Sequence, residues 1–109
     1  EVYQITEAGR EEFKRLLREV WKDLERPYYS IDVGLAFMDA LPPEEIMGYM
    51  RERVNQLDHI LHYLDGHEAD EMRREEMPPM AKAVFEHSRV HYQAELAWMK
   101  DLLKQFEKD

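Results

Sequence analysis

Histidine and glutamate side chains on one stretch of the chain have the spacing of metal ligands. His87, His91 and Glu95 follow one another at intervals of four residues, so on a helix all three project from one face. Imidazole and carboxylate groups form a reasonable ligand set for zinc or iron. His59 and His62 make a second pair, spaced by three. Such spacing is common in helices, so we interpret these residues as polar neighbours of an apolar seam, with metal binding at the first set as the alternative.

Groups that could act as nucleophiles or as acid–base pairs follow no catalytic pattern. The chain has no Cys, and its sequence contains no Ser nucleophile motif, glycine-rich phosphate loop or zincin pattern. Adjacent carboxylates such as Glu44 and Glu45 point about 100° apart on a helix, so they do not converge on one substrate. The sequence therefore predicts neither an enzyme nor a cofactor.

Methionine and tryptophan side chains offer surfaces for an apolar ligand. The chain has 7 Met and 2 Trp; Met adapts its shape and Trp presents a flat face. Most such residues at helical spacing belong to a core, but Trp98 lies beside the seam of its helix rather than on it. We therefore expect any effector to be a flat aromatic or apolar molecule. The candidate ligand-binding residues are Trp98, Tyr92, Met99 and Trp21.

The first part of the chain is predicted to be a short strand followed by two helices. Residues 1–5 alternate polar and apolar side chains, which is typical of a strand. Thr6 is the predicted N-cap of a helix over residues 7–25. Ser30 or Asp32 then caps a short helix that is apolar almost all round, and such a helix is normally buried.

Two longer helices follow, each with an apolar seam. The first begins at the Pro-Pro-Glu-Glu run and ends at Gly66, a predicted C-cap. The charged residues 67–79 are predicted to form a loop or a frayed helical extension, and the last helix begins near Met80. The seam positions are Met47, Met50, Val54, Leu57, Leu61 and Leu64 on the first, and Phe85, Ser88, Tyr92, Leu96, Met99, Leu103 and Phe106 on the second.

Composition favours compact helices with an acidic surface. The chain has 109 residues, 44% of them hydrophobic, only 4 Gly and 5 Pro, and a net charge of −9. Residues 27–79 hold 4 basic and 12 acidic side chains, so this surface repels nucleic-acid phosphates. No stretch reaches the roughly 18 apolar residues of a membrane span. The lack of Cys fits a reducing compartment, and we expect a cytoplasmic protein without a membrane partner.

Three motifs resemble segments of transcriptional regulators, the first shared by winged-helix regulators as a class and the other two typical of one family. Residues 3–10, Tyr-Gln-Ile-Thr-Glu-Ala-Gly-Arg, resemble the junction at which the second wing strand of a winged-helix domain enters the next helix. Residues 32–45, together with Glu86-His87 and Glu95-Leu96-Ala97-Trp98, resemble the C-terminal region of PadR-like transcriptional regulators. The resemblance covers nearly the whole chain, in the order and at the separations of that family. It implies the helical effector and dimerisation domain of a homodimeric regulator of transcription.

The winged-helix domain that the family places before this region is not in the sequence. The resemblance therefore implies that operator DNA is bound through that domain and not through this fragment. The implied organisation is a wing-strand remnant over residues 1–9, a linking helix over 10–26 and an effector and dimerisation domain over 27–109.

The predicted fold is all-α, with about four helices and a short N-terminal strand remnant, dimerising through its long helices. The first and last helices together carry more apolar face than one hairpin can cover, which predicts a homodimer. The predicted interface residues are Phe13, Leu17, Val20, Leu24, Phe85, Leu96, Leu103 and Phe106. The alternative function is a stand-alone helical sensor or binding bundle for a metal or an aromatic small molecule.

Overall fold

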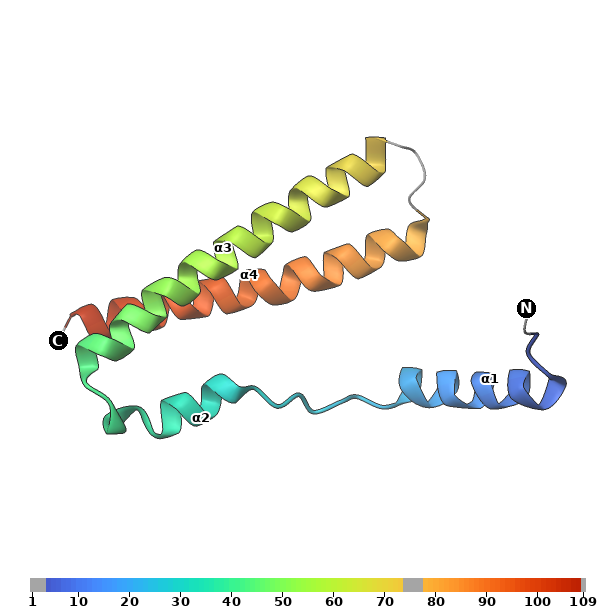
Figure 1. The fold of residues 1–109 in the computed structure, drawn as a ribbon, viewed down its shortest axis with the longest axis horizontal. Coiled ribbons are helices and arrows are strands. Elements are labelled where there is room, and N and C mark those ends of the chain that lie inside the picture. The colour runs from blue at the N-terminus through green and yellow to red at the C-terminus, as the bar shows by residue number, and fades with distance from the viewer. Residues whose placement is uncertain (1–3, 74–77, 109) are drawn as a thin grey trace. The chain divides into compact units, whose positions relative to one another are not determined.

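The computed structural model describes residues 4–73 and 78–108, and the regular structure in these ranges is helical (Figure 1). The all-α prediction is therefore confirmed. Gln4 and Ile5 are not in a strand, and residues 1–3, the rest of the predicted strand, lie outside the described residues. The elements are α1 (Glu7–Lys22), α2 (Ser30–Ala36), the 3-10 helix η1 (Met38–Ala40), α3 (Pro43–Arg73) and α4 (Pro79–Glu107).

The chain divides into two compact units, one up to Ala36 and one from Phe37 onward. The first unit holds α1 and α2, and the second holds η1, α3 and α4. The sequence placed a boundary after Arg26, whereas this division keeps the short helix α2 with α1.

Helix α1 begins at its predicted cap and ends early. The Gly9 N–H donates a hydrogen bond of 3.0 Å to Thr6 Oγ1, which confirms the cap. The helix ends at Lys22, and Asp23 has an extended backbone with φ −88° and ψ 122°. This end lies three residues before the predicted end near Glu25, because acidic residues are unfavourable at the negative end of the helix dipole and Asp is a poor helix former.

Helix α1 has a charged face and an apolar face. On the charged face Arg15 donates hydrogen bonds to Glu12 Oε2 at 3.0 Å and to Glu19 Oε1 at 2.8 Å. The apolar face is uncovered, and α1 has no buried residue. Trp21 is 84% exposed, and Leu24, just beyond the helix, is 99% exposed. Helix α1 is therefore amphipathic, and the other described residues of its own unit do not cover its apolar face.

The short helix α2 is not buried, contrary to the prediction. None of its residues is buried, and Val33 is 45% exposed. Phe37, with φ −114° and ψ 21°, leaves helical geometry and separates α2 from η1. The apolar residues predicted to encircle one helix are therefore divided between two short elements, neither of which is enclosed.

Helix α3 continues past Gly66, so the predicted C-cap there is wrong. It runs unbroken to Arg73, which agrees with a helical extension of the charged segment rather than a loop. Side chains beyond the glycine have partners that stabilise the extra turns: the His67 ring stacks on Tyr63, with centroids 5.9 Å apart, and Glu68 pairs with Arg89 of α4. Residues 74–77, the middle of the predicted loop, lie outside the described residues.

Helices α3 and α4 form an antiparallel hairpin that contains the core (Figure 1). The buried apolar side chains are Met50 and Leu57 of α3 and Met99 of α4. All three are predicted seam positions, and the other seam residues are half-buried except Tyr92, which is at the edge of exposure. The seam prediction is therefore confirmed for both helices. Of the described residues, no helix is both long and apolar enough to cross a membrane.

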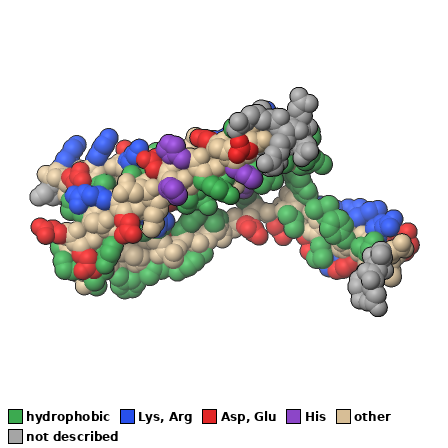
Figure 2. All heavy atoms as spheres, turned by 45° about the horizontal axis from the view of Figure 1, so that its top comes forward, with side chains coloured by type: hydrophobic (Ala, Val, Ile, Leu, Met, Phe, Trp, Pro, Cys, Tyr) green, Lys and Arg blue, Asp and Glu red, His purple; other side chains and the backbone are tan. Residues whose placement is uncertain are grey.

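Ion pairs join α3 and α4 near both ends of the hairpin. Arg51 Nη2 lies 3.2 Å from Glu107 Oε1 near one end. Arg89 Nε lies 3.0 Å from Asp65 Oδ1 near the other, and the same guanidinium bonds Glu68. Charged side chains are spread over the visible surface, as Figure 2 shows. These cross-helix pairs fix the register of α3 against α4 more than they add stability, since exposed ion pairs contribute little.

Candidate functional site

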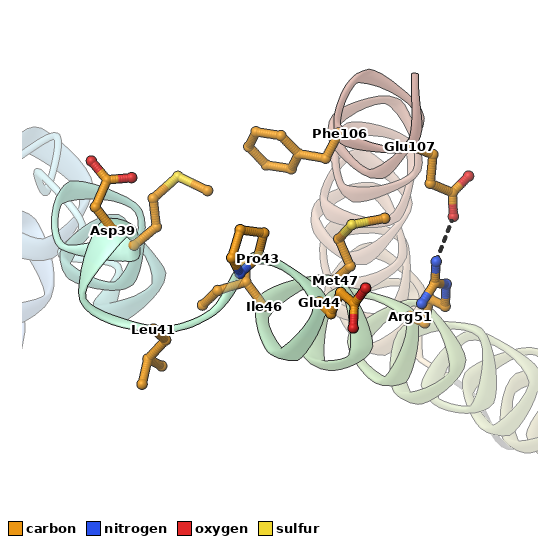
Figure 3. Close-up of a pocket in the computed structure, with 10 residues that line it drawn as sticks. Asp39, Leu41, Pro43, Glu44, Ile46, Met47, Arg51, Phe106 and Glu107 are labelled. Carbon is orange, nitrogen blue, oxygen red and sulfur yellow. Dashed lines mark hydrogen bonds and ion pairs between the residues drawn. The ribbon is translucent and has the colours of Figure 1, made fainter. Parts of the chain in front are cut away.

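A groove opens at the end of the hairpin where α3 begins and α4 ends (Figure 3). Its volume is about 840 Å³. The segment containing η1, the first turns of α3 and the last turn of α4 supply its walls. Figure 3 shows the Phe106 ring pointing from α4 toward the space between the helices and this segment. The lining residues are Met38, Asp39, Leu41, Pro43, Glu44, Ile46, Met47, Arg51, Phe106 and Glu107.

The sequence builds this wall through a proline start to α3. Pro43 is the first helical residue, where its missing N–H costs no hydrogen bond. The Pro42 carbonyl accepts the Glu45 N–H at 3.1 Å and the Ile46 N–H at 3.2 Å. Glu44 and Glu45 occupy the first turn and complement the positive end of the helix dipole. This helix terminus is therefore already matched with negative charge and does not favour an anionic ligand.

The charged side chains that line the groove also disfavour an anionic ligand. Asp39, Glu44 and Glu107 contribute three carboxylates against the single guanidinium of Arg51. Arg51 lies 3.2 Å from Glu107, so these two charges offset each other and two carboxylates remain. Apolar side chains such as Phe106 and Met47 complete the lining. Such a groove favours neutral or cationic apolar molecules and repels aromatic carboxylates.

The predicted ligand-binding residues do not line this groove and do not form one cluster. Trp98 and Tyr92 of α4 are 37% and 36% exposed, but their six-residue separation places them about 120° apart around the helix. Met99 is only 1% exposed. It belongs to the hairpin core and offers almost no surface to a ligand in this structure. Trp21 lies in the first unit. Trp98 and Tyr92 remain accessible, each on its own side of α4.

The predicted interface residues differ in their solvent exposure. Those of the first unit are largely exposed: Phe13 at 58%, Leu17 at 44%, Val20 at 72% and Leu24 at 99%. Those of α4 are half-buried and follow the seam that packs against α3; they are Phe85, Leu96, Leu103 and Phe106. The hairpin therefore uses much of the α4 seam within the chain.

The predicted three-residue metal set is only partly assembled. The Nε2 atoms of His87 and His91 lie 3.0 Å apart. Glu95 instead faces α3, with its Oε2 3.8 Å from Arg53 Nη2. In the part of the chain that the structure describes, no group of three or more His, Asp or Glu side chains is placed to hold a metal. The His62 Nδ1–H donates a hydrogen bond of 2.8 Å to the Asp58 carbonyl.

Sequence reasoning did not find the groove, because its walls lie far apart in the chain. Asp39 and Glu107 lie before α3 and at the end of α4, and no local sequence pattern connects them. One signal was present: in an antiparallel hairpin the first seam position of α3, Met47, must lie near the last seam position of α4, Phe106. Aligning the two seams in this way would have located one end of the groove.

No protein-family model, curated protein or solved structure matches this chain.

Proposed function

We propose that the chain is the dimerisation and effector-sensing domain of a PadR-like transcriptional regulator. The observation that carries the proposal is the uncovered apolar face of α1, on which Val20 is 72% and Trp21 84% exposed. A helix with one apolar and one charged face normally lies against a partner. Large exposed apolar patches on small domains mark interaction surfaces.

A second copy of the chain is the partner that best fits this face. Within α1, Phe13, Leu17 and Val20 follow at intervals of four and three, the spacing at which two identical helices interlock. Leu24 continues this spacing in the sequence but lies just beyond the end of the helix. The charges that would oppose such a contact lie elsewhere, since Arg15 is engaged with Glu12 and Glu19 on the other face of the helix. A two-fold axis brings the same face of both copies together and closes the assembly.

In this proposal the effector binds to the hairpin, and a separate winged-helix domain binds DNA. The exposed Trp98 offers a flat face for an aromatic effector, and the groove lined by Phe106 and Met47 offers a second apolar surface. The acidic hairpin does not contact DNA. The competing function, a stand-alone helical sensor, requires no dimer, so the oligomeric state separates the two.

The test measures the molar mass of the chain by sedimentation equilibrium over a range of concentrations. We expect a dimer for the unaltered chain and dissociation for Val20→Glu, because an unpaired carboxylate in an apolar interface costs several kcal/mol. Arg18→Glu on the charged face is the matched control. It changes the net charge by more than Val20→Glu does, yet it should remain dimeric.

Two outcomes would contradict the proposal. A chain that stays monomeric at high micromolar concentration would favour the stand-alone sensor. Equal dissociation of Val20→Glu and Arg18→Glu would show that overall charge, rather than the apolar face of α1, controls association.

A further inference from the structure

Two histidines on α4 place their ring nitrogens at the separation of ligands on one metal ion. His87 Nε2 and His91 Nε2 lie 3.0 Å apart. Two nitrogens that each bind a metal at 2.0–2.1 Å are separated by about 2.8–3.4 Å for angles of about 90–109° between neighbouring ligands. The spacing between the rings is therefore already that of a chelate.

Both rings are also accessible to an ion from solution. Each histidine is exposed, and the two rings meet edge to face with centroids 4.5 Å apart. Histidine side chains are visible on the surface of the hairpin in Figure 2. Exposed side chains change rotamer on a fast timescale, so small rotations of the rings suffice to aim both lone pairs at one ion. The net charge of −9 raises the local concentration of cations around the chain.

We propose that His87 and His91 form a two-histidine chelate for a divalent first-row transition-metal ion, independent of the dimerisation proposed above. The ion takes the place of the proton shared by the two Nε2 atoms. That proton passes through solvent to the Nδ1 atom of the same ring, so each neutral ring then carries its N–H on Nδ1 and no net proton is released. Two protein ligands leave at least two coordination positions to water. Imidazole nitrogens favour Cu²⁺, Ni²⁺ and Zn²⁺, with Cu²⁺ bound most tightly, and do not hold Mg²⁺ or Ca²⁺.

The other histidine pair of the hairpin supplies a matched control. His59 and His62 are three residues apart on α3, and His62 Nδ1 is engaged by the Asp58 carbonyl at 2.8 Å. The control pair therefore consists of the same two residue types on the same hairpin. It differs from His87 and His91 in that its ring nitrogens form no short contact with each other. Its removal should not affect the ion bound on α4.

Trp98 reports on the proposed site from the same face of α4. It follows His91 by seven residues, which places it about 20° around the helix and about 10 Å along its axis. The test is a Cu²⁺ titration of the Trp21→Phe chain, in which Trp98 is the one remaining tryptophan. We expect saturable quenching at one ion per chain and recovery of fluorescence when EDTA removes the copper.

The variants decide the assignment. His87→Ala and His91→Ala should each weaken binding of the ion by at least about tenfold. The reason is that the remaining imidazole then binds the ion without the high effective concentration of a second imidazole beside it. The double variant His59→Ala/His62→Ala should bind as the parent does. Quenching that persists in both α4 variants, or that disappears in the α3 control, would overturn the proposal. Circular dichroism of every variant establishes that the hairpin remains helical.

Discussion

Arg53 of α3 and Glu95 of α4 face each other across the middle of the hairpin without forming a hydrogen bond. Arg53 Nη2 lies 3.8 Å from Glu95 Oε2, and the two side chains are 40% and 31% exposed. Arg53 Nε and Glu95 Oε2 are buried and have no hydrogen-bond partner among the residues that the structure describes. The pair has thus lost part of its hydration without gaining the geometry that offsets the loss.

Replacing both members of this pair with apolar residues should not destabilise the hairpin. We expect Arg53→Met/Glu95→Leu to match the parent chain or to gain about 1 kcal/mol in free energy of unfolding. Glu95→Leu alone should lose up to about 1 kcal/mol, because a half-exposed Arg53 then lacks its partner. Urea unfolding followed by circular dichroism at one protein concentration measures both. A double variant less stable than the single one would contradict this account.

Tyr49 should ionise at higher pH than a free tyrosine. Its hydroxyl donates a hydrogen bond of 3.1 Å to Glu45 Oε2, and this bond, followed by the charge of the same carboxylate, raises the pKa of Tyr49 above its ordinary value near 10. The stabilising contribution of the bond is complete below that ordinary value and is lost as pH rises through the higher folded pKa.

The tyrosinate absorbance, compared with that of Tyr49→Phe, isolates this titration. Glu45→Gln should lower the pKa of Tyr49 toward the ordinary value, whereas Glu44→Gln, a neighbouring carboxylate that is not its hydrogen-bond partner, should change it less. Equal shifts in the two variants would show that general negative charge sets the pKa.

Trp98→Ala should abolish the response to planar aromatic ligands and leave the oligomer intact. The reason is that Trp98 is over one third exposed and lies beside the hairpin seam, so it contributes more surface than core. Calorimetric titration of neutral and cationic planar aromatics measures binding, and sedimentation measures the oligomer. A loss of dimer stability of about 3 kcal/mol or more, the range for truncating a buried Trp, would assign Trp98 to the interface instead.

The chain by itself should not retain DNA at physiological salt. Residues 27–79 hold 12 acidic side chains against 4 basic ones, and phosphate contacts supply most non-specific affinity. An electrophoretic mobility assay with a broad set of duplexes checks this. Sequence-specific retention by the chain alone would contradict both this prediction and the proposed division of roles.

Periodicity and capping predicted the parts of the fold that depend on neighbouring residues. The three-and-four spacing from Met47 to Leu64 identified the face of α3 that packs on α4, and Met50 and Leu57 on that face are buried. Thr6 was recognisable because an N-cap depends on a side chain and an N–H three residues away.

Features that depend on tertiary context were not predictable in this way. Gly66 is a common helix terminator, but here partners on and across from the next turn, such as Phe85 against His67 with centroids 5.4 Å apart, favour continuing the helix. The groove and the pairing of Arg53 with Glu95 depend on the register between two helices. A single helical pattern contains no information about that register.

The small core of the hairpin links the survival of this chain to its abundance. Its described apolar core residues are Met50, Leu57 and Met99, a modest source of stability for a domain of this size. In the proposed dimer, covering the apolar face of α1 stabilises the first unit of each chain, so each tenfold dilution lowers the apparent stability of the dimer by about 1.4 kcal/mol. Scarce chains would spend more time open to proteolysis than abundant ones. The proposed dimer would then accumulate only above a threshold level of expression, because below it newly made subunits are degraded before they dimerise.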